Sequence, residues 1–211
     1  MGLLDNMFGA GPKGLRKPKS IRHNGKTVDE ILAAHLNFFT GKPGGVRGDL
    51  TGADLRGVDL YQANLTGVNL EGANLAGANL KGAKLVRANF SGAKMRGADL
   101  RNTDMTEAQL PGADLTEAQA SGVEFFRCDM SQAVFCRANL RNANFRQSNL
   151  RGALFAGADM GVTILRETDL DGVDLSGVDL TTTLLPKGYQ PPAGSVASKS
   201  EAKAGAEQGK H

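Results

Sequence analysis

Acidic and amide side chains recur along most of the chain at intervals of five residues, as in Asp54, Asp59, Asn64 and Asn69. Carboxylates at a fixed spacing could bind a cation or serve as acid and base in catalysis. This spacing is too regular for a single site, because almost every segment of the repeat carries the same group. Asp and Asn side chains commonly hydrogen-bond the backbone at turns, so we interpret the ladder as structural.

Histidine and cysteine are too scattered to predict a reactive centre. The three His residues are His23, His35 and His211, and the two Cys residues are Cys128 and Cys136. No Cys/His cluster has the spacing of metal ligands, and no phosphate-binding loop or dinucleotide fingerprint is visible. The two Cys fall in opposite phases of the repeat, so a disulfide is not expected. The sequence therefore predicts a non-enzymatic protein with no catalytic, metal-binding or cofactor-binding residues.

The repeat that carries the acidic ladder organises the chain from Val46 to Leu185. Every fifth residue from Leu50 to Leu185 falls in one phase, and all twenty-eight are Leu, Phe or Met except Ala120. A small residue stands two positions before each of them. A period of five fits neither an α-helix nor a plain strand. The pattern predicts short extended pieces joined by corners, with the large and small residues inward and Asp or Asn outward.

The motif itself is specific. Residues 53–57 (ADLRG) and 73–77 (ANLAG) resemble the repeat of the pentapeptide-repeat family. That resemblance implies an all-β solenoid, a right-handed quadrilateral β-helix with four pentapeptides per coil. The repeats would then form about seven coils, in which residues twenty apart lie directly above one another. The topoisomerase-protecting relatives in this family usually dimerise through their C-terminal ends, so the resemblance implies a homodimer through the C-terminal coil.

The segments that flank the repeat divide the chain into four parts. Residues 1–26 are expected to form a basic, disordered arm, and residues 27–45 a short capping α-helix with a linker. The β-helix itself occupies residues 46–185. Residues 186–211 are expected to form an end cap followed by a disordered tail, because the tail is rich in Ala, Ser, Lys, Gly and Glu.

The capping helix has clear boundary signals. Thr27 and Glu30 match a capping box, and apolar residues follow them at helical spacing. Gly41 and Pro43 end the helix. We expect it to cover the open end of the first coil, since an exposed solenoid end is prone to aggregate. His35 lies near the apolar edge of this helix, where a structural role is expected.

Charge is unevenly distributed. The whole chain has a formal net charge of +3, whereas residues 46–185 carry fourteen Lys/Arg and seventeen Asp/Glu. Both tails are basic. No long apolar segment and no signal-peptide core are visible, which favours a cytoplasmic location. The basic arm offers an alternative, peripheral attachment to the anionic surface of the inner membrane.

Several outward positions depart from the polar pattern, and adjacent apolar residues on a surface indicate a contact site. The alternative is that a tail or a long neighbouring side chain covers them. These candidate interaction residues are Val134, Leu154 and Cys136 on one side of the column, and Phe126, Arg146, Arg166, Ile164 and Leu184 on another. An outward stack of Phe126 on Arg146 would be a cation–π contact.

Three functional classes are compatible with these features. The first is a scaffold that binds a protein partner, whose identity the sequence does not specify. The second is a membrane-surface scaffold attached through residues 1–26. The third, implied by the family resemblance, is a DNA mimic that modulates DNA gyrase or topoisomerase. The near-balanced charge of the column argues against the third class and against nucleic-acid binding. We therefore predict a protein-binding module.

Overall fold

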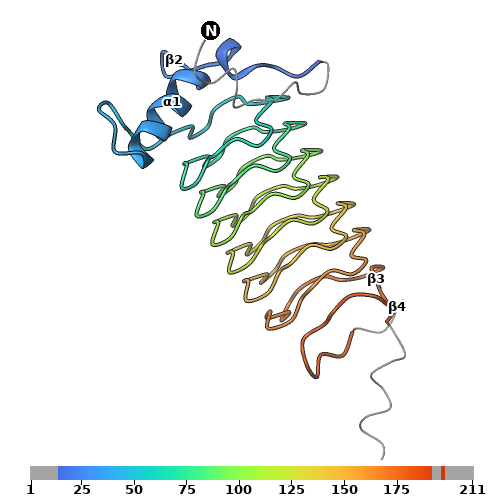
Figure 1. The fold of residues 1–211 in the computed structure, drawn as a ribbon. Helices are drawn as coiled ribbons and strands as arrows, with labels where there is room; N and C mark the ends of the chain where they lie inside the picture. The colour runs from blue at the N-terminus through green and yellow to red at the C-terminus, as the bar shows by residue number, and fades with distance from the viewer. Residues whose placement is uncertain (1–13, 192–195, 198–211) are drawn as a thin grey trace, which may run out of the picture.

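The computed structural model describes residues 14–191 and 196–197, which form a long column with a helix at one end (Figure 1). Parallel bridges join residues twenty apart, such as Asp49 with Asn69 and Asp54 with Asn74. One coil therefore takes twenty residues and has four sides, which we name the 49-, 54-, 59- and 64-sides after their first bridging residues. This arrangement confirms the predicted quadrilateral β-helix of about seven coils.

Tight corners separate the sides of each coil. A backbone hydrogen bond closes nearly all corners, as from the Ala53 N–H to the Leu50 carbonyl at 3.0 Å, whereas the Cys128 N–H donates to Ser148 Oγ. The residue before the small one has a positive φ, which Gly52 (66°) adopts without a steric penalty. This requirement explains why Gly recurs in the motif. Val162 occupies the same position (59°), although β-branched residues rarely have positive φ.

The column is filled by the residues of the five-residue phase. From Leu50 to Leu180, none of these side chains is more than 7% exposed, which confirms the predicted inward register. Phenylalanines in neighbouring coils stack on each other, with ring centroids 4.9 Å apart for Phe125 and Phe145. Phe135 lies edge-on to Phe125 across the interior at 6.0 Å. Apolar burial of this kind supplies most of the stabilisation, because each inward side chain is removed from water.

Both cysteines are free, and they point in different directions as predicted. Cys128 is buried in a small inward position, whereas Cys136 is half-buried on the outside of the column. Burial raises the pKa of the Cys128 thiol to about 12. The thiol is therefore protonated at neutral pH, and it lacks the thiolate character that reactive cysteines need.

Four short elements cover the N-terminal end of the column. They are η1 (Pro18–Ser20), β1 (Arg22–His23), β2 (Lys26–Thr27) and α1 (Val28–Phe39). The strands β1 and β2 form an antiparallel hairpin through Asn24 and Gly25, which both have positive φ. The predicted capping box is present: the Glu30 N–H donates to Thr27 Oγ1 (3.2 Å) and the Thr27 N–H donates to the Glu30 carboxylate (2.7 Å).

The N-terminal end differs from the predicted disordered arm over residues 1–26. Residues 14–26 pack on the column, and Arg16 forms a parallel bridge with Val58 in the first coil. The Arg16 N–H donates to the Gly57 carbonyl (2.8 Å), and the Asp59 N–H donates to the Arg16 carbonyl (2.9 Å). This part of the chain thus adds a partial coil above the 59-side. The composition of residues 14–26 could not predict this pairing, because the partner is the exposed backbone edge of the first coil, about forty residues later in the chain. Residues 1–13 lie outside the described part.

The C-terminal end is closed differently. Leu185 and Tyr189 are half-buried against the last coil. The strand β3 (Asp179–Leu180) pairs in parallel with β4 (Val196–Ala197), so residues beyond the repeat add a short strand there. The predicted disorder of the remaining tail concerns residues 192–195 and 198–211, which lie outside the described part. None of the described helices has the length and apolar character needed to cross a membrane.

Candidate functional site

An apolar patch interrupts the polar surface of the 54-side. Its bridging residues are Asp54, Asn74, Lys94, Asp114, Val134, Leu154 and Asp174. Val134 pairs directly with Leu154 in the next coil. Leu154 is 41% exposed, and Cys136 and Ala156 lie beside the pair. We call these four residues the 54-side patch: Val134, Cys136, Leu154 and Ala156.

An ion-pair network lies at the corner next to this patch. Arg137, which follows Cys136, donates to Glu117 at 2.8 Å, and Arg96 donates to the same carboxylate at 3.0 Å. The hydrogen bond from Arg137 and the positive charges of both guanidinium groups lower the pKa of Glu117. The corner is therefore charged but locally compensated. Together, the patch and the network form an apolar surface with a polar rim, as protein-binding sites have.

The second predicted group lies on the 64-side, which is opposite the 54-side in a four-sided coil. Ile164 and Leu184 form a parallel bridge, and Leu184 is 38% exposed. Their corner neighbour Val162 is 46% exposed. Val162 was not among the predicted residues, although it stands at a repeat position that usually holds Gly and could have been recognised for that reason. The two predicted apolar groups thus lie on opposite sides and do not form one site.

The predicted stack of Phe126 on Arg146 is wrong in its partner. The guanidinium of Arg127 lies over the Phe126 ring, 4.8 Å from its centroid. Arg146 instead forms an ion pair with Glu167 at 2.7 Å. An adjacent carboxylate attracts a guanidinium more strongly than an exposed aromatic ring does, because the ring offers only about 0.5–1 kcal/mol at the surface. Arg166 is exposed on the same side.

The cap carries a third exposed apolar group, which was not among the predicted interaction residues. Phe38 is 50% exposed, Phe39 is 49% exposed and Val46 is 61% exposed. Two consecutive Phe residues on a helix point about 100° apart, so both could not face the column. Two adjacent Phe residues in the sequence therefore indicate that at least one of them is exposed.

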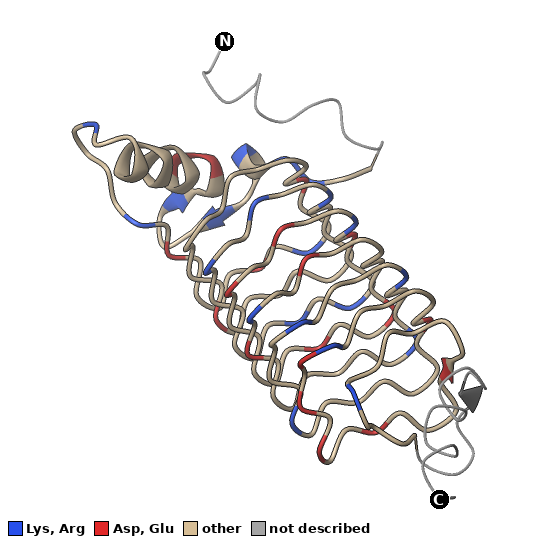
Figure 2. Cartoon of the chain, turned by 60° about the horizontal axis from the view of Figure 1, so that its bottom comes forward, with Lys and Arg blue, Asp and Glu red and all other residues tan. Residues whose placement is uncertain are grey.

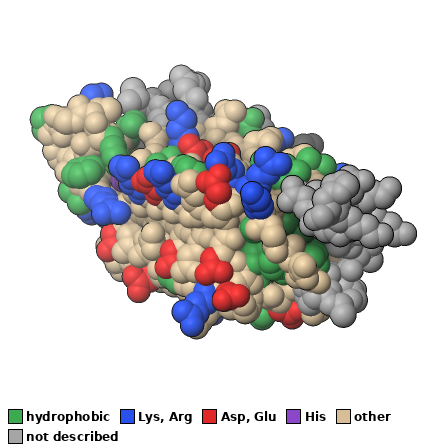
Figure 3. All heavy atoms as spheres, turned by 90° about the horizontal axis from the view of Figure 1, so that it is seen from below, with side chains coloured by type: hydrophobic (Ala, Val, Ile, Leu, Met, Phe, Trp, Pro, Cys, Tyr) green, Lys and Arg blue, Asp and Glu red, His purple; other side chains and the backbone are tan. Residues whose placement is uncertain are grey.

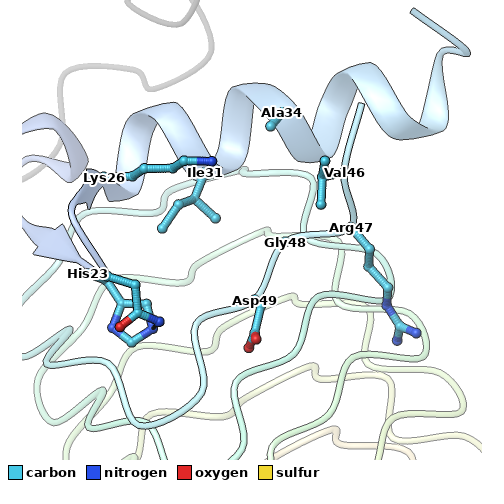
Figure 4. Close-up of a pocket in the computed structure, with 9 residues that line it drawn as sticks. His23, Lys26, Ile31, Ala34, Val46, Arg47, Gly48 and Asp49 are labelled. Atoms are coloured by element: carbon cyan, nitrogen blue, oxygen red, sulfur yellow. Dashed lines mark hydrogen bonds between the residues drawn. The ribbon is translucent and has the colours of Figure 1, made fainter. Parts of the chain in front are cut away.

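A small pocket of about 210 Å³ lies between the cap and the first coil (Figure 4). Ile31, Ala34 and Val46 form its apolar wall, and Lys26 extends across it beside Ile31. The polar residues His23, Asn24 and Asp49 complete the lining. The Arg47 side chain points away from His23 and Asp49 in Figure 4, and its Nε donates to the Gly67 carbonyl.

The buried titratable groups hold the cap in place. His35 is only 1% exposed, and its Nδ1 accepts a hydrogen bond from the Gly48 N–H at 2.9 Å. Burial lowers the pKa of His35, so the neutral ring is favoured. Asp59 is fully buried and pairs with Lys17 at 3.1 Å. Within the described residues, no group of three or more His, Cys, Asp or Glu is arranged to hold a metal ion.

Comparison with known proteins extends these observations. The family model for pentapeptide repeats matches residues 49–82, 83–119, 118–155 and 143–181, with eight copies. No curated protein matches the chain. Among solved structures, HetL, a pentapeptide repeat protein involved in heterocyst differentiation regulation from the cyanobacterium Nostoc sp. strain PCC 7120, is 33% identical. That match covers 68% of this chain and 68% of HetL, with a TM-score of 0.55.

Two further structures are more distant. Rfr23, a pentapeptide repeat protein from the cyanobacterium Cyanothece 51142, is 27% identical over 58% of this chain and 90% of its own, with a TM-score of 0.45. QnrB1, a plasmid-mediated fluoroquinolone resistance protein, is 19% identical over 71% of this chain and 87% of its own, with a TM-score of 0.45. The repeat, the four-sided coils and the family match agree: the chain belongs to the pentapeptide-repeat family.

Proposed function

We propose that this protein is a non-enzymatic binding module whose 54-side patch contacts a protein partner. The observation that carries the proposal is the pairing of Val134 with Leu154 at positions that hold polar residues in five of the seven coils. Leu154 is 41% exposed. Burying a leucine side chain fully contributes about 1.5–3 kcal/mol, so its exposure is a cost that a partner would remove.

The backbone of the column makes this surface rigid. Val134 and Leu154 each donate an N–H to the preceding coil, to the carbonyls of Ala113 (2.9 Å) and Ala133 (3.0 Å). A rigid, flat apolar surface loses little conformational entropy on binding, which favours affinity. Proteins of this family are generally structural or binding modules, and HetL is involved in heterocyst differentiation regulation. Both facts support a binding role.

The charge distribution disfavours the alternative of a DNA mimic. Duplex DNA carries one negative charge per about 1.7 Å of its axis. In this column, several outward carboxylates are already paired with arginine, as Glu117 is with Arg137, and Asp159 with Arg141. Paired carboxylates present less negative potential to a basic groove. We therefore propose that the protein neither inhibits nor protects DNA gyrase.

The test compares the wild type with Val134→Asp/Leu154→Asn in two experiments on the full chain. Partner proteins from the native cell are quantified after capture, and self-association is measured by analytical ultracentrifugation. We expect the double variant to lose the partner. The matched control is Ile164→Asp/Leu184→Asn, which introduces the same polar residues on the 64-side. This variant should still bind the partner. Unchanged binding and self-association in the first variant would refute the assignment. A supercoiling assay with gyrase tests the alternative, and strong inhibition or protection would support the DNA-mimic function.

A further inference from the structure

Exposed apolar side chains concentrate at the cap. Among the described residues, six large apolar side chains are conspicuously exposed, and three of them fall within nine residues of the cap. These three, Phe38, Phe39 and Val46, are also the most exposed of the six. We call them the apolar tip. The other three, Leu154, Val162 and Leu184, lie on the column.

Ring contacts and a backbone hydrogen bond order the residues of the apolar tip. Phe38 and Phe39 lie edge-on to each other with centroids 5.3 Å apart, and Phe39 also lies edge-on to the buried ring of His35 at 5.0 Å. The loop after α1 returns so that the Val46 N–H donates to the Ala34 carbonyl at 3.1 Å. Figure 1 shows α1 lying across the end of the column, with its last turn and the following loop projecting beyond the coils.

Basic residues surround the apolar tip. Residues 14–48 carry seven Lys/Arg and only two acidic residues, whereas residues 49–185 carry thirteen Lys/Arg and seventeen acidic residues. Lys42 lies in the projecting loop and Arg47 follows Val46 directly. Figure 2 shows the basic residues of the cap, including those of the hairpin and the loop. The molecule is therefore polarised, with its positive end at the apolar tip.

The apolar surface continues from the tip into the pocket of Figure 4. Val46 belongs to both, and Ile31 and Ala34 extend the apolar wall along α1. Lys26 extends across this wall beside Ile31, so a cation lies next to the apolar groups. An apolar surface bordered by cations matches the interface of an anionic bilayer, where acyl chains lie just below phosphate groups.

We propose that the cap end is a docking surface for an anionic phospholipid bilayer. Phe38, Phe39 and Val46 insert among the lipids, while Lys42 and Lys26 lie at the phosphates. A bilayer is favoured over an acidic protein because the apolar residues project from the end of the molecule. A fluid surface can enclose a projecting tip, whereas a protein needs a complementary cavity. The column would then point away from the membrane and leave the 54-side patch accessible, so this proposal is independent of the proposed protein-binding function.

Vesicle co-sedimentation of the full-length protein tests the proposal. The vesicles contain phosphatidylcholine alone or an equimolar mixture of phosphatidylcholine and phosphatidylglycerol. We expect binding to the mixed vesicles, weakening with added salt, and little binding to phosphatidylcholine alone. Phe38→Ser/Phe39→Ser should weaken the partitioning by about tenfold or more. Lys42→Gln should weaken it about fivefold, because one basic residue near the surface is lost.

Two control variants on the column test whether vesicle binding depends on the apolar tip or on any exposed apolar or basic residue. Leu154→Ser removes an exposed apolar residue, and Arg151→Gln removes an exposed cation; both should leave vesicle binding unchanged. Lys42 lies in an exposed loop, so its variant reports on docking even where the double Phe variant is destabilised. Absence of binding to the mixed vesicles would overturn the proposal. So would binding that the tip variants leave unchanged, or that Leu154→Ser weakens equally. Tip-dependent binding of an acidic protein without vesicle binding would assign the surface to a protein instead.

Discussion

Ile21, Val28 and Leu32 lie buried over the N-terminal end of the column, whereas the half-buried Leu185 and Tyr189 cover its C-terminal end. The inward residues near the two ends differ in their exposure to solvent. Leu50 is completely buried, while Leu170 in the last coils is 7% exposed. The N-terminal end also contains a buried aspartate, Asp59, which is paired with the half-exposed Lys17, and a buried histidine. A folded cap therefore seals one end more completely than a folded-back chain seals the other.

The two ends of the molecule also differ in the residues that they expose. Figure 3 shows one long face on which apolar side chains gather near both ends and charged residues lie between them. The cap end combines apolar exposure with positive charge. Toward the other end, exposed apolar residues are accompanied by acidic ones. No Lys or Arg interrupts the series Glu167, Asp169, Asp171, Asp174 and Asp179. The two ends therefore suit different partners.

The largest expected effect is the loss of a cap residue. Leu32→Ala should lower the free energy of unfolding by about 2–5 kcal/mol, because it leaves a cavity above the first coil. The matched substitution at the other end, Tyr189→Ala, should cost less, since Tyr189 is only half-buried. Urea unfolding of both variants measures the difference. Equal costs would show that the two ends are sealed equally well.

The next prediction concerns two aspartates on the same 59-side ladder. Asp59→Ala should cost about 1–3 kcal/mol, because it removes buried hydrogen bonds. The lost partners are Asn79 at 2.8 Å, in a buried hydrogen bond, and Lys17 at 3.1 Å and the Tyr61 N–H at 3.4 Å, in partly buried ones. The control Asp179→Ala, at the exposed end of the ladder, should change the stability by no more than about 0.5 kcal/mol. Thermal melting gives both values, and a costly Asp179 substitution would refute the comparison.

A smaller effect is expected from the capping box of α1. Thr27→Ala removes the acceptor for the Glu30 N–H and should cost about 1 kcal/mol. Thr27→Ser keeps the hydroxyl and should remain close to the wild type. Hydrogen exchange of the α1 amides distinguishes the two, because fraying should increase only in the alanine variant. Identical exchange in both variants would mean that packing alone holds the helix.

The smallest effect is a pH dependence of the N-terminal end. Burial lowers the pKa of His35 below its ordinary value of 6.5. Well above pH 6.5 the ring is neutral in both states, and it adds no pH dependence. As the pH falls through this value, the unfolded chain binds a proton that the folded chain resists, so stability decreases.

His35→Gln should flatten this dependence, because the amide oxygen can accept the Gly48 N–H without titrating. The melting temperature of the two proteins is compared between about pH 7.5 and about pH 5.5, above the range in which carboxylates titrate. A parallel decrease in both proteins would show that His35 is not responsible. An increase in the stability of the wild type at the lower pH would contradict the direction of the pKa shift.

The sequence alone was enough to predict the β-helical column and the capping helix at its N-terminal end. The five-residue phase specified which side chains point inward, because a slip of one residue would expose every large apolar group. Thr27 and Glu30 specified the start of α1, since a capping box depends only on neighbouring residues. Val134 with Leu154, and Ile164 with Leu184, were correctly placed as coil neighbours because they are twenty residues apart.

Tertiary structure decided the features that depend on distant partners. Arg16 and Lys17 pack on the column because Val58 and Asp59 present an edge and a carboxylate there, which the local composition does not show. The Arg127 guanidinium lies over Phe126, whereas Glu167 holds Arg146 in an ion pair. The exposure of Phe38 and Phe39 likewise depends on where α1 crosses the end of the column. Local periodicity fixes which face of a repeat is buried, whereas end contacts and surface side chains depend on the geometry of the whole assembly.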